Sequence, residues 1–153
     1  MRAYYLPIVA GSLLSLSAFL PWIRVGDAAL TGISGAAGWW ILGLGLVAMT
    51  LAALSIATRK NSRHPILIVG LVALGIEFLA SRVLGRSAAE AAWVSSQASA
   101  LLHGMAPPAD PRTAVGSGIY LGLTAAGALV AFGLTIVVRR SASAYREPMD
   151  DDV

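Results

Sequence analysis

The chain has no cysteine and only two histidines, His64 and His103, among its 153 residues. Without cysteine it can form no disulfide bond, thiolate metal site, iron–sulfur cluster or covalently attached c-type haem. The two histidines fall on opposite sides of the membrane in the topology derived below, and neither lies inside an apolar stretch. We therefore expect no metal site, no cofactor-binding residue and no redox chemistry carried by this chain.

Charge is also scarce: charged residues make up 12% of the chain and hydrophobic residues 57%, and the mean hydropathy is +0.74. These values lie outside the usual range for a soluble domain. The run from Ile41 to Leu54 offers no polar face of the kind that a helix in a soluble bundle needs. Little of the chain lies outside its apolar stretches, and that leaves too small an extramembrane mass for an enzyme.

The net charge of +3 does not indicate nucleic-acid binding. A phosphate-binding surface needs cations gathered on one folded face. Here they stand beside the apolar stretches, where positive charge sets the orientation of a membrane protein. Lys60 is the only lysine beside ten arginines in a chain rich in alanine and glycine, a composition typical of bacteria with G+C-rich genomes.

What the sequence does contain is four apolar stretches, at 4–20, 39–57, 65–81 and 119–138. A bilayer core is about 30 Å thick, and a helix crosses it with close to 20 residues. The first stretch is built like the core of a signal peptide, but no small-residue cleavage site follows it, so we expect a retained span. The sequence thus predicts one all-α domain with four transmembrane helices over 1–153.

The cations beside the spans predict their orientation. With both termini inside, seven cations face the cytoplasm and four face outward, the asymmetry of the positive-inside rule. The cytoplasmic set is Arg2, Arg59, Lys60, Arg63, Arg139, Arg140 and Arg146. The outer set is Arg24, Arg82, Arg86 and Arg112. We expect an N-in/C-in polytopic protein in the bacterial inner (cytoplasmic) membrane.

The segments outside the spans carry three further expectations. Val25–Leu30, in the first outer loop, is expected to form a short hairpin. In the second loop, Ser87-Ala88-Ala89-Glu90 has the S-x-x-E form of a capping box. It predicts a separate amphipathic helix over about 88–103, lying on the outer membrane surface or across the mouth of the bundle. The tail, 141–153, is expected to be disordered unless a partner orders it.

Glu77 is the only carboxylate within a predicted span. It lies about 18 Å along the helix from Pro65, in the outer half of the bilayer, where a charged side chain costs a few kcal/mol. One interpretation is a proton-relay, ion or quinone-headgroup site. The other is a structural hydrogen bond or ion pair, with Ser81 and Arg82 in reach on the same helix, or a bond to a partner protein. No other span offers an acid or a base, which favours the structural interpretation.

Small residues are spaced for close helix packing in the first and last spans. The last span has Gly118-x-x-x-Gly122 with Gly127 further along, and the first has Gly11 followed by Ser15. In lipid, such small faces and the van der Waals fit they allow drive helix association. The contacts they make are expected either within the bundle or with a neighbouring protein's helix.

The tryptophans Trp22, Trp39, Trp40 and Trp93 are expected at the membrane interface, where indole rings are favoured. For Trp93 the alternative is a buried anchor in a protein contact, because aromatic side chains dominate interface hot spots. No catalytic residues emerge from the sequence. The outer loops assemble no Ser/His/Asp triad, and Gly43-Leu44-Gly45 lies within a span without the context of a phosphate-binding loop.

Two motifs in the first 60 residues resemble a loose group of small bacterial four-span proteins of unassigned function. In these proteins a Leu-Pro-Trp step ends the first span, and a Thr-Gly-x-x-Gly element follows in the first outer loop. Here the corresponding residues are Leu20-Pro21-Trp22 and Thr31-Gly32-Ile33-Ser34-Gly35. The resemblance implies a four-span layout and no particular activity.

The function expected from these features is a non-enzymatic accessory or structural subunit of a larger bacterial inner-membrane complex, of a photosynthetic or respiratory kind. Its expected partners are membrane lipids and other integral membrane subunits, with no nucleic acid. The alternative is a small transporter or channel that uses the intramembrane Glu77.

Overall fold

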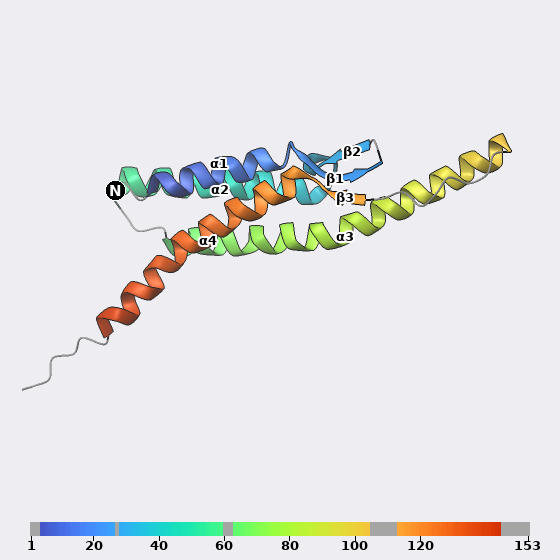
Figure 1. The fold of residues 1–153 in the computed structure, drawn as a ribbon. Helices are drawn as coiled ribbons and strands as arrows, with labels where there is room; N and C mark the ends of the chain where they lie inside the picture. Colours follow the sequence, from blue (N-terminus) through green and yellow to red (C-terminus); the bar gives the residue numbers. More distant parts are fainter. Residues whose placement is uncertain (1–3, 27, 60–62, 105–112, 145–153) are drawn as a thin grey trace, which may run out of the picture.

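The computed structural model describes the chain except for residues 1–3, 27, 60–62, 105–112 and 145–153. In this part of the chain four α-helices and three short strands follow one another (Figure 1). Their bounds are α1 Tyr5–Ser17, β1 Pro21–Val25, β2 Ala28–Thr31, the 3₁₀ turn η2 Gly32–Ser34, α2 Ala36–Thr58, α3 Arg63–His103, β3 Thr113–Val115 and α4 Ser117–Ala144. The described chain is mostly helical, as its apolar stretches predict.

Three helices are long and apolar enough to cross a membrane, namely α2, α3 and the Ser117–Thr135 part of α4. The expected spans 39–57, 65–81 and 119–138 lie within these three helices. The expected first span, 4–20, is helical over a shorter segment, because α1 has 13 residues, or about 20 Å of length. Three helices of this length and hydropathy are consistent with a membrane protein.

The helices pack closely through glycine at two crossings, α1 with α2 and α3 with α4, and through larger aliphatic side chains in the core. α1 contacts both α2 and α4, and α4 also lies against α3. The core between them holds the fully buried side chains Leu14, Ile41, Ile66, Ile119 and Leu129.

A three-stranded antiparallel sheet caps one end of the helices, with strand order β2-β1-β3. β1 and β2 form the hairpin expected near Val25–Leu30, with Val25 paired to Ala28 across a turn in which Gly26 has a φ of +57°. β3 was not expected. It comes from the segment before α4 and pairs Ala114 with Arg24 on the other edge of β1.

The end of β3 is fixed to the start of β1. The backbone N–H of Gly116 donates to the Trp22 carbonyl at 2.7 Å. A Cβ at position 116 would overlap the Pro21 carbonyl, so only glycine lets the two backbones come this close. The sheet thus joins both outer segments into one layer above the helices.

The separate outer helix expected over 88–103 is wrong, because α3 runs without a break from Arg63 to His103. Residues 82–103 are rich in alanine and contain no proline, so they favour continuing the helix. The Ser87 hydroxyl donates backward to the carbonyls of Val83 and Leu84, each at 3.3 Å. A mid-helix serine commonly bonds this way, so the S-x-x-E spacing is not a capping box here. In Figure 1 this part of α3 extends well past the sheet.

Candidate functional site

A buried polar cluster lies where α1 ends, between α3 and α4. Its centre is Glu77 of α3, whose side chain is fully buried. The Ser17 hydroxyl, at the end of α1, lies 3.4 Å from Glu77 Oε1 as a donor, and it also donates to the Leu14 carbonyl at 2.6 Å. A hydroxyl has one proton, so the shorter bond to Leu14 leaves Glu77 weakly held. The cluster is the candidate site because it places the one carboxyl group of the predicted spans among three helices.

The second carboxyl oxygen of Glu77, Oε2, is buried without a hydrogen-bond partner in the described part of the chain. The ion pair with Arg82 and the bond to Ser81, both considered from the sequence, do not form. Arg82 stacks on the Phe78 ring at 5.4 Å, and the Ser81 hydroxyl donates to the Phe78 carbonyl at 2.6 Å. Sequence reasoning missed Ser17, because 60 residues separate it from Glu77 and only the fold brings them together.

Space for the Glu77 carboxyl comes from the glycine face of α4. A Cβ at position 122 would overlap Oε1 and Cδ of Glu77. A Cβ at position 118 would lie 2.6 Å from Cδ1 of Trp22 and 2.8 Å from the Ser17 carbonyl. The Gly118-x-x-x-Gly122 face is therefore filled by side chains of this chain. Gly127 has nothing within 4 Å of its Cβ position, so it takes no part in that contact.

α1 uses its small residues in the same way, against α2. A Cβ on Gly11 would lie 2.8 Å from the Gly45 carbonyl, and a Cβ on Gly45 would lie 2.7 Å from the Gly11 carbonyl. Ser15 donates its hydroxyl to the Leu42 carbonyl of α2 at 3.3 Å. Gly11 and Ser15 thus lie at a close crossing of α1 and α2, within the chain.

Trp22 is not the interface anchor expected from the sequence, because its side chain is only 2% exposed. Its indole Nε1–H donates to the Ser17 carbonyl at 2.9 Å, next to the Glu77 cluster. Gly118 on one side and Gly32 on the other leave room for the ring, since a Cβ on Gly32 would lie 2.5 Å from Cε2 of Trp22. The Leu-Pro-Trp step therefore places a buried indole at the end of the helices that the sheet caps.

The other three tryptophans are exposed. Trp39 and Trp40, in the first turn of α2, lie on the surface, as side chains at a membrane interface would. Trp93 is 42% exposed and lies on the part of α3 beyond the bundle. We call that part, residues 82–103, the α3 arm.

The α3 arm carries several large apolar side chains that nothing in the described chain covers well. Val94 is exposed, and Leu101 and Leu102 are 83% and 84% exposed. The arm is about 33 Å long at 1.5 Å per residue. It therefore presents an apolar surface outside the packed helices.

No metal centre is indicated, since no group of three or more acidic or histidine side chains that could hold an ion occurs in the described ranges. His64 and His103 lie at opposite ends of α3. The chain matches no family model and no curated protein.

Proposed function

We propose that this protein is a non-enzymatic accessory subunit of a larger bacterial inner-membrane complex, and that the α3 arm is its docking element. All four helices cross the membrane in this account, with both termini in the cytoplasm. The cation asymmetry supports that orientation. α1 is shorter than the bilayer core is thick. In this account it crosses together with its flanking residues, and the bilayer thins locally around it, as happens around short apolar segments.

The exposed apolar surface of the α3 arm is the observation that carries the proposal. An isolated helix is marginally stable in water, and most helical stability comes from packing an apolar face. Large exposed apolar patches on a folded protein mark sites of interaction. Leu101 and Leu102, at the far end of the arm, are the most exposed large apolar side chains of the described chain. A partner that covers them would supply the packing that the arm lacks.

The partner we propose is another integral membrane subunit with a domain on the outer side of the membrane. The arm starts directly after the predicted third span, so anything that it touches lies within about 33 Å of the bilayer. Photosynthetic and respiratory assemblies recruit small helical subunits of this kind, and we propose one of these as the complex.

Site-directed photocrosslinking from the arm tests the proposal. A photoreactive residue at position 101 should form one dominant crosslink to a single integral membrane protein in the native membrane. The same residue at the lipid-facing position 120 serves as the control, because Tyr120 is exposed on α4 away from the arm. Val94→Glu with Leu101→Glu should remove the crosslink partner from a native purification. The paired substitutions Ser95→Glu and Ser99→Glu, which add the same charge at exposed polar positions, should leave it in place. An equal loss with both pairs would contradict the docking role of the apolar face.

A small transporter or channel centred on Glu77 is the second candidate, and the unpartnered Oε2 favours it. Its test is flux in proteoliposomes with Glu77→Gln, using Glu90→Gln on the exposed side of the arm as the matched control. Flux that Glu77→Gln alone abolishes would establish this second function. The subunit account expects no flux from the wild-type protein.

A further inference from the structure

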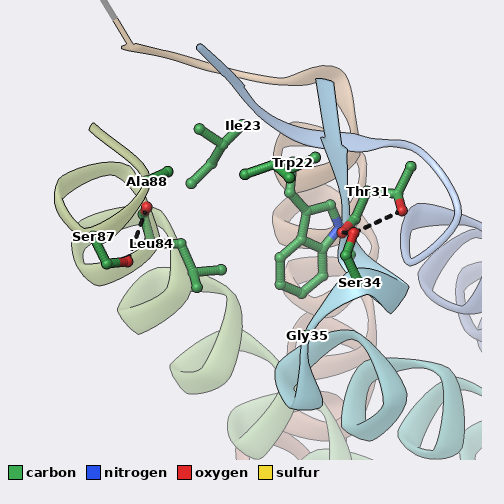
Figure 2. Close-up of a pocket in the computed structure, with 10 residues that line it drawn as sticks. Trp22, Ile23, Thr31, Ser34, Gly35, Leu84, Ser87 and Ala88 are labelled. Atoms are coloured by element: carbon green, nitrogen blue, oxygen red, sulfur yellow. Dashed lines mark hydrogen bonds between the residues drawn. The ribbon is translucent and has the colours of Figure 1, made fainter. Parts of the chain in front are cut away.

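A cavity of about 250 Å³ opens between α3 and the first outer segment, apart from the Glu77 cluster and from the tip of the α3 arm. Figure 2 shows Trp22 and Leu84 facing each other across it, with Ser87 and Ala88 on the α3 side. Its floor is buried and its rim is exposed to the surroundings. It is larger than the 150 Å³ cavity that holds a benzene molecule and smaller than a typical drug-sized site. One end of an elongated ligand would fill it.

The Thr-Gly-x-x-Gly element of the first outer segment forms one wall of this cavity. Thr31, Gly32, Ser34 and Gly35 all line it. Gly32 lies against the indole of Trp22, so a side chain at this position would displace the ring that closes the floor. The element thus builds a cavity wall, a role that its sequence pattern did not reveal.

The chemistry of the lining selects an uncharged ligand. Among the residues that the structure describes, none that lines the cavity carries a charge. The apolar members of the lining are Trp22, Ile23, Leu30, Leu84 and Ala88. The indole Nε1–H is turned away and bonded to the Ser17 carbonyl. A charged headgroup would therefore be desolvated in the cavity without a partner, at a large cost in free energy.

The hydroxyl groups of Thr31, Ser34 and Ser87 on the rim are already engaged in hydrogen bonds within the chain, so they can serve a ligand as acceptors. Ser34 donates to the Thr31 carbonyl at 2.6 Å, and the Thr31 and Ser34 hydroxyls lie 3.1 Å apart (dashed in Figure 2). Ser87 donates to carbonyls of its own helix. Each hydroxyl oxygen keeps a lone pair for a ligand. A ligand with a hydroxyl group of its own meets this need, since it brings a proton to donate.

A second, wholly apolar groove lies next to the cavity. It has a volume of about 220 Å³ and lies between α2 and α3, and Leu84 lines both it and the first cavity. Its other walls are Ala37, Ile76, Leu79, Ala80 and Val83. These residues belong to the apolar part of α3 and the start of α2, where the two helices enter the predicted membrane. The apolar lining of the groove suits an acyl chain.

We propose that the two cavities together bind one uncharged lipid with a free hydroxyl group, of the diacylglycerol class. The hydroxyl end sits among Thr31, Ser34 and Ser87, and an acyl chain follows the groove past Leu84 into the bilayer. Leu84, Ser87 and Ala88, at the start of the α3 arm, line this site. The docking role rests on Val94, Leu101 and Leu102 farther along the arm, and none of these three lines either cavity.

Quenching of Trp22 fluorescence by a brominated lipid tests the proposal directly. Trp39, Trp40 and Trp93 are replaced by phenylalanine, so that only the cavity tryptophan reports. The protein is placed in phosphatidylcholine vesicles with increasing amounts of brominated diacylglycerol. Ala88→Phe fills the cavity, and Ala91→Phe, at an exposed position on the same helix, is the matched control. Far-ultraviolet circular dichroism and the Trp22 emission maximum without bromine check that each variant is folded.

The expected result is saturable quenching by brominated diacylglycerol in the control, reduced at least fivefold by Ala88→Phe. Two further brominated lipids, phosphatidylglycerol and a diacylglycerol whose hydroxyl is acetylated, should quench Trp22 only to the level of brominated phosphatidylcholine. Equal quenching in the two variants, or equal quenching by all four lipids, would overturn the proposal. If Ala88→Phe does not fold, native mass spectrometry of the unaltered protein decides: preferential retention of diacylglycerol over its acetylated form supports the site, and equal retention refutes it.

Discussion

Gly122 of α4 lies so close to Glu77 of α3 that a Cβ at position 122 would overlap the Glu77 carboxyl group. The only carboxylate in the predicted spans and the small-residue face of the last helix are therefore parts of one contact. A side chain at 122 would have to expel the carboxyl from its place beside Ser17.

Replacing Gly122 with leucine should destabilise the bundle by about 3 kcal/mol or more, because it overpacks a fully buried contact. Gly127→Leu is the matched control on the same helix, since its Cβ position has nothing within 4 Å. Thermal unfolding in mild detergent measures both. Equal melting temperatures for the two variants would show that the contact is misassigned.

Glu77→Gln should change stability by about 1 kcal/mol or less. The glutamine keeps the shape and one accepting oxygen for Ser17, and Ser17 retains its 2.6 Å bond to Leu14. Glu77→Lys, which puts a longer cation in the same closed place, should prevent stable folding. Unfolding of the purified variants in increasing denaturing detergent gives the comparison, and a large loss with Gln would mean that the carboxyl has a partner outside the described residues.

Trp22→Phe should cost about 1 kcal/mol through loss of the Nε1 bond to the Ser17 carbonyl. Trp22→Ala should cost about 3–5 kcal/mol, because it also leaves a cavity at the outer end of the bundle. Trp40→Ala is the exposed control and should be nearly neutral in detergent. If Trp22 were an interface anchor, as the sequence suggests, Trp22→Ala and Trp40→Ala would have the same small effect.

Ser87→Ala should leave the backbone amide of Glu90 as protected from hydrogen exchange as it is in the wild type. In a capping box the Ser87 side chain would bond that amide, and its loss would cost about 1 kcal/mol of local stability. In the continuous helix the amide bonds within the backbone of α3, and alanine is the better helix former. Exchange measured by mass spectrometry distinguishes the two, and a clear rise in exchange at residues 88–90 would restore the separate outer helix.

The sequence predicts the helices well because twenty apolar residues in lipid have little alternative to a helix. It also predicts the hairpin near Val25–Leu30, where Gly26 supplies the positive φ of the turn. The pairing of β3 with β1 was not predictable, since Thr113–Val115 becomes a strand only when α1 and α4 bring it to the edge of β1.

The candidate site was predictable in its parts and not in its arrangement. Glu77, Gly118 and Gly122 each stand out in the sequence, one as a lone carboxylate and two as a small-residue pair. Their contact depends on how α3 rotates against α4, which hydropathy does not specify. The burial of Trp22 could not be predicted either. An indole that follows a proline at the end of a span can lie at the membrane interface or be buried between the helices, and the sequence fits both.

The central claim, that the protein is a subunit of a larger complex, is most directly tested by the size at which it migrates after gentle solubilisation. The tagged protein would be purified from its native membrane without denaturation, and the material that migrates with it would be identified by mass spectrometry. We predict a large assembly with one or more integral membrane subunits in fixed ratio to this chain, lost when Val94 and Leu101 become glutamate. A monomer or a small homo-oligomer, unchanged by those substitutions, would contradict the account.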